Sequence, residues 1–123
     1  MRVDHIGVPA HDARTSATAL AEILGAPAPT LDGADGDMFR VELEDGAFLL
    51  FAPAPSEKVD VVHVAFRVDA ARFTAIVKRL RESNIPFGND PEDPRNGRTD
   101  DELGGAGRVY FVDANKHLFE VTC

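Results

Sequence analysis

The chain repeats one order of secondary-structure patterns. When Val41–Phe51 is placed on Phe111–Val121, turn-forming residues fall on turn-forming residues and strand-forming residues fall on strand-forming residues. Each half reads as strand, helix, short strand, strand and strand, and the linker-like segment Pro53–Lys58 separates the halves. Because each half needs both a helix and several strands, the repeat predicts a mixed fold made of two similar modules.

The two helices are predicted from apolar residues spaced at i, i+3, i+4 and i+7, which line up on one helix face. This spacing is met by Ala17, Leu20, Ala21 and Leu24 in the first half, and by Phe73, Ile76, Val77 and Leu80 in the second. A strand precedes each helix, at Arg2–Val8 and Val59–Val68, and we expect Pro9 to end the first of them. A further short strand is expected at Ile85–Gly88.

One domain accommodates the whole chain, because 123 residues are enough to bury a core without further stabilisation. We therefore predict a single α+β domain over residues 1–123, with internal modules at 1–53 and 59–123. The polar stretch Asn89–Gly105 is expected to be a lid or a disordered segment, since long loops in compact domains are usually one or the other.

The charge balance limits the partners of this protein. The net charge is −8 and the isoelectric point is near 4.8, so a basic face for nucleic acid or an anionic membrane is not expected. The only cysteine is Cys123, which excludes an intrachain disulfide and a cluster of thiolate ligands. No apolar run is long enough to cross a bilayer, and the start of the chain lacks a signal-peptide pattern. We expect a soluble cytoplasmic protein.

Three ionisable residues interrupt apolar strand patterns, at His5, His63 and Glu120. The repeat aligns His5 with His63, whereas Glu120 aligns with Leu50. Each residue alone has an ordinary explanation, as a hydrogen-bonded core or edge histidine or as a carboxylate on a wet sheet face. A buried Glu120 would need a partner, because an unpaired buried charge is costly. The two histidines hold equivalent places in the repeat, and their coincidence with Glu120 in one duplicated fold favours the hypothesis that all three meet at one metal ion.

The sequence resembles the vicinal oxygen chelate superfamily, which includes glyoxalase I, methylmalonyl-CoA epimerase, fosfomycin-modifying thiol transferases, extradiol dioxygenases and bleomycin-resistance proteins. The resemblance covers the whole chain, and its most specific parts are D-H-I-G-V, H-V-A-F-R-V-D and G-R-V-Y-F-V-D-A-N-K-H-L-F-E-V. It implies two tandem βαβββ modules that form an open half-barrel around a metal site. The metal ligands implied by the resemblance are His5, His63 and Glu120.

Two imidazoles and one carboxylate form a facial ligand set that leaves positions open for water or a bidentate substrate. Such a set suits a divalent ion of Fe, Mn, Zn or Ni. The ion would polarise substrate oxygens or stabilise an enolate. We therefore expect a metal-dependent enzyme that acts on a small substrate through two oxygens, with Glu120 at the reacting centre.

Two further residues are expected on the face of the predicted site. Arg67 lies on the same side of its strand as His63 and is assigned to an anionic group of the substrate, although an exposed arginine at a strand end is equally common. Tyr110 lies ten residues before Glu120, a spacing at which fosfomycin-modifying enzymes carry a tyrosine that contacts substrate. This resemblance implies a substrate-binding and catalytic role for Tyr110, and ordinary strand packing is the alternative.

Differences from the family pattern limit the reaction types that this protein is expected to catalyse. Glyoxalase I and the epimerase carry a fourth ligand at the position that is Leu50 here, and leucine cannot bind a metal. This weakens the glyoxalase I and epimerase assignments, although the lyase type is kept as one of three reaction types. The three-ligand pattern is shared with extradiol dioxygenases and thiol transferases, which are the other two. A metal-free protein that binds small molecules, as bleomycin-resistance proteins do, is the alternative function. A homodimer is expected, because one pair of modules leaves sheet edges uncovered. The resemblance implies that its sites are shared between subunits.

Overall fold

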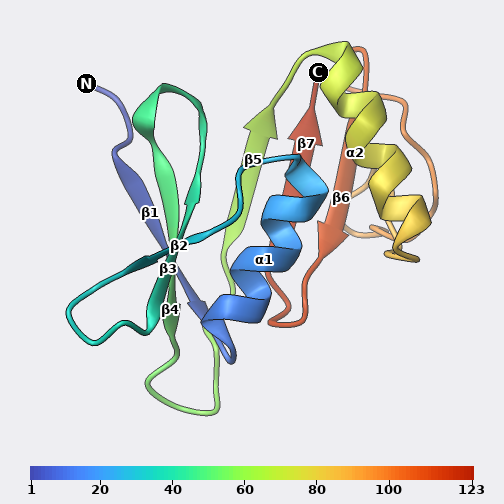
Figure 1. Ribbon diagram of the computed structural model, residues 1–123. Helices are drawn as coiled ribbons and strands as arrows, with labels where there is room; N and C mark the ends of the chain where they lie inside the picture. The colour runs from blue at the N-terminus through green and yellow to red at the C-terminus, as the bar shows by residue number, and fades with distance from the viewer. The chain divides into compact units, whose positions relative to one another are not determined.

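The computed structural model describes residues 1–123, which divide into two units, Met1–Asp60 and Val61–Cys123. Figure 1 shows that each unit contains one helix and one sheet. The strands form two separate open sheets and no closed barrel. The predicted α+β class is therefore confirmed, and each unit is described by itself below.

The N-terminal unit has the predicted βαβββ order. Its elements are β1 (His5–Ala10), α1 (Ala13–Leu24), β2 (Thr30–Asp32), β3 (Met38–Glu42) and β4 (Phe48–Pro53), with a single 3-10 turn at Glu44–Gly46. The strands lie in the order β1-β4-β3-β2, and β1 is parallel to β4 while the other neighbours are antiparallel. The alternating side chains of this sheet bury one face, which includes Val8, Val41, Leu49 and Phe51.

Helix α1 covers that face with the apolar stripe predicted from the sequence. Asp12 begins the helix, because its carboxylate accepts a hydrogen bond from the Thr15 backbone N–H over 3.0 Å. Gly25 ends it in the left-handed conformation at φ 68°. The prediction that Pro9 ends the first strand is wrong, since β1 continues to Ala10. A proline is tolerated there because β1 is an edge strand and its N–H groups are not all needed for pairing.

The C-terminal unit repeats the arrangement with a reduced second strand. It contains β5 (His63–Arg67), α2 (Ala70–Glu82), β6 (Arg108–Val112) and β7 (Leu118–Thr122), in the sheet order β5-β7-β6. The strand expected at Ile85–Gly88 is only one isolated bridge, between Gly88 and Tyr110. Pro86 lacks a backbone donor, which leaves little of this segment able to pair. Asp69 begins α2 by accepting from the Arg72 N–H over 2.7 Å.

The pairing of strands confirms the internal repeat at the level of single residues. His5 lies opposite Phe48 and Gly7 opposite Leu50 in the N-terminal sheet. In the C-terminal sheet, His63 lies opposite Leu118 and Ala65 lies opposite Glu120. The two histidines thus hold equivalent positions, and Glu120 stands where the first unit has Leu50.

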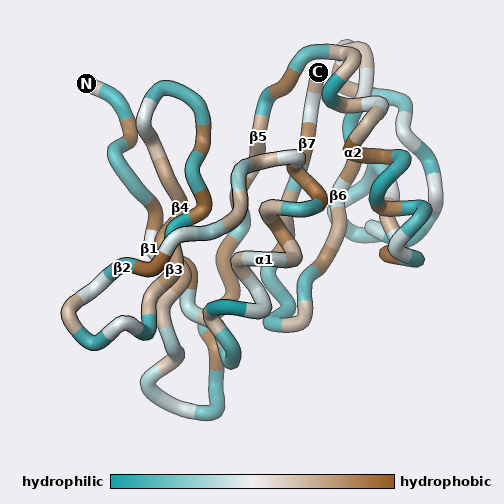
Figure 2. The backbone as a smooth tube through the Cα atoms, viewed as in Figure 1, coloured by the Kyte–Doolittle hydropathy of each residue, from teal (hydrophilic) through white to brown (hydrophobic).

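The polar stretch between α2 and β6 is mostly hydrophilic, as its colour in Figure 2 shows. Side-chain hydrogen bonds to the backbone hold it in place. Asn96 Oδ1 accepts from the backbone N–H groups of Asn89 and Arg98, and the Asn96 amide donates to Asn89 Oδ1 over 2.9 Å. The Gly97 N–H also donates to the Phe87 carbonyl over 2.8 Å. These bonds give the segment a defined conformation, so disorder is not the correct reading of its composition. Neither helix of the chain is long and apolar enough to cross a membrane.

Candidate functional site

The open face of the C-terminal sheet brings together three of the predicted site residues. Strand alternation places His63, Tyr110 and Glu120 on this face. His63 Nε2 lies 3.0 Å from Glu120 Oε2, and the His63 side chain is 50% exposed whereas that of Glu120 is 8% exposed. Tyr110 is the direct strand partner of Glu120, and its ring centroid lies 6.2 Å from that of His63. A buried carboxylate is thus flanked by an imidazole and a phenol.

The buried Glu120 carboxylate has a partner for each of its oxygens. Its Oε1 atom forms an ion pair with Arg108 Nη1, while Oε2 contacts His63. Arg108 Nε also donates to Asp101 Oδ1 over 2.9 Å. Asp101, Arg108, Glu120 and His63 therefore form one continuous polar network, which supplies the partner that the sequence required for a buried Glu120.

The charges in this network shift the protonation of its outer members. The Arg108 guanidinium, which donates to Asp101, lowers the pKa of the Asp101 carboxyl below its usual value, and the Leu103 backbone N–H adds to the effect. The same hydrogen bond raises the pKa of Arg108. Both shifts favour the charged forms, so the Asp101–Arg108 pair is ionised wherever the protein is folded near neutral pH.

Arg108 and Asp101 were not predicted as site residues. For Arg108 the sequence did carry a signal, because it lies two residues before Tyr110 and so shares the face of Glu120. Asp101 gave none, since it lies in an irregular loop without periodicity. Arg67 was predicted and lies at the exposed end of β5, opposite Thr122, where it forms no ion pair. It is available to a ligand on the same sheet face.

His5, the remaining predicted ligand, lies at the start of β1 in the N-terminal unit. Its ring stacks on Phe48, with centroids 4.9 Å apart and planes 11° from parallel. Its Nδ1 atom lies 2.6 Å from Asp4 Oδ2. A carboxylate beside Nδ1 favours a proton on that nitrogen and leaves the Nε2 lone pair for a ligand. This is the arrangement in which metal-binding histidines are usually held.

The distance between His63 and Glu120 can be compared with the requirements of a metal ion. Two donor atoms that each lie about 2.1 Å from one ion, at right angles, are separated by about 3.0 Å. The observed separation of Nε2 and Oε2 is 3.0 Å. The two side chains therefore fit adjacent positions of an ion with little movement. No group of three or more His, Cys, Asp or Glu side chains is gathered as metal ligands would be. The predicted set takes one ligand from the first unit and two from the second.

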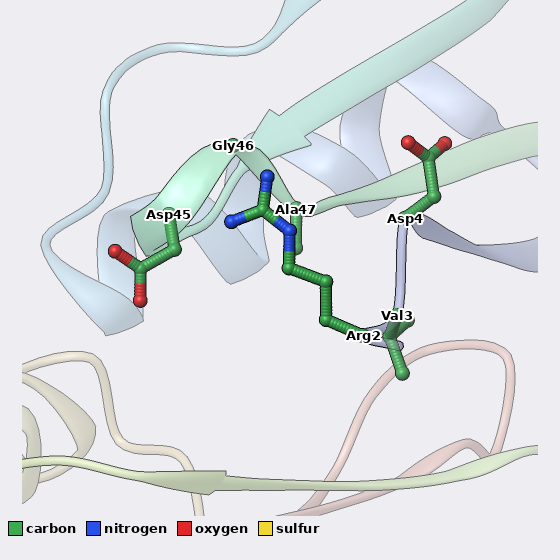
Figure 3. Close-up of a pocket in the computed structure, with 6 residues that line it drawn as sticks. All are labelled: Arg2, Val3, Asp4, Asp45, Gly46 and Ala47. Carbon is green, nitrogen blue, oxygen red and sulfur yellow. The ribbon is translucent and has the colours of Figure 1, made fainter.

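Two small hollows lie outside this constellation. The first has a volume of about 80 Å³ and lies beside the turn before β4, where Arg2 extends across it (Figure 3); its lining residues are Arg2, Val3, Asp4, Asp45, Gly46 and Ala47. The second, of about 150 Å³, is lined by Pro86, Pro94, Arg95 and Val112. Both are smaller than a typical ligand pocket of about 300 Å³ or more. They do not replace the open sheet faces as the candidate site.

No protein-family model and no curated protein sequence matches this chain. Among solved structures, it is similar to one described as "Oxidase ChaP-H1", with 31% sequence identity and a TM-score of 0.90, over 99% of this chain and 94% of that chain. A glyoxalase/dioxygenase from Nostoc punctiforme shares 23% identity at a TM-score of 0.73, over 99% and 90% of the two chains.

A third similar structure is the genomically encoded fosfomycin resistance protein FosX from Listeria monocytogenes, complexed with Mn(II) and sulfate. It shares 17% identity at a TM-score of 0.70, over 99% of this chain and 89% of that one. The similarity to these structures extends over nearly the full length of each chain. It agrees with the repeated βαβββ order described above. This protein belongs to the vicinal oxygen chelate superfamily.

Proposed function

We propose that this protein is a metal-dependent enzyme whose small substrate binds through oxygens to a divalent ion held by His5, His63 and Glu120. The observation that carries the proposal is the 3.0 Å contact between His63 Nε2 and Glu120 Oε2 on an open sheet face. The Asp4 contact that leaves His5 Nε2 available supports it. When bound, the ion would polarise the substrate oxygens and stabilise negative charge that develops on them.

Oxidation is the reaction type that we favour. The structure with 31% identity is described as an oxidase, and a facial set of two histidines and one carboxylate is typical of iron oxygenases. These points favour a redox-active ion, Fe or Mn, over Zn or Ni. Leu50 in place of a fourth ligand argues against the isomerase and lyase members.

The protein's own residues would bind and orient the substrate. The Arg67 guanidinium, which forms no ion pair, would bind an anionic group of the substrate at the end of β5. Tyr110 would donate a hydrogen bond to a substrate oxygen beside Glu120.

Metal analysis and titration of the purified protein test this proposal. We expect about one divalent ion per chain, and we expect His63→Ala and His5→Ala to lose most of the affinity for added Mn²⁺. His11→Ala is the matched control, because this exposed histidine follows β1 and is outside the proposed ligand set. If all three variants bind Mn²⁺ as the wild type does, the proposed site is wrong.

A closed dimer with shared sites is the assembly that we propose. Each site would then take His5 from one subunit and His63 with Glu120 from its partner. Mixing His5→Ala protein with Glu120→Ala protein should restore one intact site per heterodimer. Because equal mixing makes about half of the dimers heterodimers, the mixture should regain about a quarter of the wild-type metal binding. Mixtures that never regain Mn²⁺ binding, although heterodimers form, would exclude sites shared in this way.

A metal-free binding protein is the second candidate. It is favoured by the fact that both oxygens of Glu120 already have protein partners, His63 and Arg108. In this case the same face would hold a small molecule without an ion. Ligand binding would then survive both chelator treatment and His63→Ala, whereas the enzyme proposal requires that both abolish it.

A further inference from the structure

Arg108 occupies an unusual position between two carboxylates. It lies on β6 on the same face as Glu120, and its side chain is 15% exposed. The Glu120 side chain is 8% exposed and that of Asp101 is 3% exposed. An arginine enclosed in this way loses solvation and side-chain freedom, and the two carboxylates offset this cost. The planar guanidinium can donate to both at once, which a lysine ammonium cannot do in the same geometry.

Asp101 is itself fixed by the loop that carries it. Its Oδ1 atom accepts from the Leu103 backbone N–H over 2.9 Å, and its Oδ2 atom accepts from the Gly105 N–H over 3.1 Å. A side chain at Gly105 would collide with Asp101 Oδ2. The loop is tied to the sheet as well, because the Arg108 N–H donates to the Thr99 carbonyl over 3.0 Å. The loop thus holds the Asp101 carboxylate in one position, and Asp101 in turn holds the Arg108 guanidinium.

We propose that Asp101 and Arg108 are positioning residues for Glu120, which hold its Oε1 atom and leave Oε2 alone to serve as a metal ligand beside His63. This inference rests on the proposed function and deepens it. The terminal torsion of a glutamate is soft, so a free carboxylate would rotate or bind the ion through both oxygens. Holding Oε1 keeps Glu120 to one coordination position and leaves one more position for substrate oxygens.

For one variant, the net charge alone and the positioning role predict opposite changes in the affinity for a cation. This variant therefore tests the proposal. The formal charge of Asp101, Arg108 and Glu120 together is −1. Replacing Arg108 by a neutral residue makes it −2, which by electrostatics alone would tighten the binding of a cation. The positioning role predicts weaker cation binding, because Glu120 loses the side chain that fixes the orientation of its carboxylate. Replacing Asp101 by asparagine weakens binding in both cases, so Arg108 is the informative position.

The experiment is a titration with Mn²⁺, in which the electron paramagnetic resonance signal of the free ion reports the unbound metal. We expect Arg108→Met and Asp101→Asn to raise the dissociation constant about 10- to 100-fold, as loss of partners of metal ligands usually does. Arg108→Lys should lie between Arg108→Met and the wild type. Arg98→Met is the matched control: Arg98 is an exposed arginine of the same loop that pairs with Asp100 and Glu102, and its loss should leave the dissociation constant unchanged.

Thermal unfolding of the metal-free variants separates positioning from a structural role, because a purely structural pair would lower the melting temperature without changing the Mn²⁺ affinity of the folded protein. If Arg108→Met fails to fold, the Arg108→Lys titration decides the question in its place. Unchanged or tighter Mn²⁺ binding in the folded Arg108 variants overturns the positioning role and leaves the proposed function standing. If the wild type itself binds no Mn²⁺, both the proposed function and this inference are wrong.

Discussion

Gly107 immediately precedes β6, and a methyl group there should disturb the packing that holds the candidate site. A Cβ atom at this position would lie 2.6 Å from Cε1 and 2.7 Å from Cζ of Phe73, on α2. The Phe73 side chain is 8% exposed, so the ring has little room to move away. Gly107 does not adopt the left-handed conformation. The cost of Gly107→Ala is therefore steric rather than conformational.

The magnitude follows from two opposing effects. Overpacking of a dense core costs about 1–3 kcal/mol. Replacement of glycine by alanine at a compatible backbone position stabilises the fold by about 0.4–1 kcal/mol, because it reduces the conformational entropy of the unfolded chain. We expect Gly107→Ala to lower the free energy of unfolding by about 1–2 kcal/mol, measured by urea denaturation followed by circular dichroism.

A double-mutant cycle with Phe73→Leu tests whether the steric contact with Phe73 causes this loss of stability. Leucine lacks the two ring atoms that come closest, so in this background Gly107→Ala should be close to neutral, and the coupling energy should be about 1–2 kcal/mol. Gly7→Ala is the control, because nothing lies within 4 Å of a Cβ there, and it should not be destabilising. If Gly107→Ala costs the same in both backgrounds, a clash with Phe73 is not the cause.

Three further predictions concern the helix ends and the metal. Asp69→Ala should lower the free energy of unfolding by about 0.5–2 kcal/mol in urea denaturation, because it removes the acceptor for the Arg72 N–H, while Asp69→Asn should remain near wild type. Hydrogen bonds from Thr15 lower the pKa of Asp12. Asp12 therefore stabilises the fold above its unfolded pKa of about 3.9, and this contribution disappears as the pH falls through the lower folded value. The stability advantage of wild type over Asp12→Ala, measured by urea denaturation at several pH values, should shrink below about pH 4; a constant advantage down to pH 2 would contradict this reasoning. If the proposed site binds Mn²⁺, a concentration 100 times its dissociation constant should raise the free energy of unfolding by about 2.7 kcal/mol, and a chelator should reverse the gain in a thermal melt.

The sequence was most informative where the structure is periodic. Apolar spacing located both helices, and the alignment of the two halves correctly matched Leu50 with Glu120, which lie opposite Gly7 and Ala65 in their own sheets. Strand alternation predicted that Arg67 shares the face of His63, and the resemblance predicted that Tyr110 lies near Glu120. These features follow from the geometry of regular strands and helices, which a pattern of residue types records directly.

The sequence was least informative in the loop between α2 and β6. Its conformation depends on single hydrogen bonds in which the Asn89 side chain donates to a backbone carbonyl and the Asn96 and Asp101 side chains accept from backbone N–H groups. Such bonds leave no repeating pattern, and the same composition is common in disordered segments. The role of Asp101 toward Arg108 could not be predicted for this reason, although the face of Arg108 could.

The matched strand pairing of the two units has a consequence for how ligand sets can change in such a protein. In each sheet the last strand runs parallel to the first, so one position on the last strand lies beside the histidine of the first. That position holds a carboxylate in the second unit and Leu50, which is only half-buried, in the first. A single codon change at Leu50 would therefore offer His5 the same neighbour that His63 already has. Because the strand pairing is the same in both units, one substitution could place a carboxylate beside His5 and leave the strand pairing unchanged.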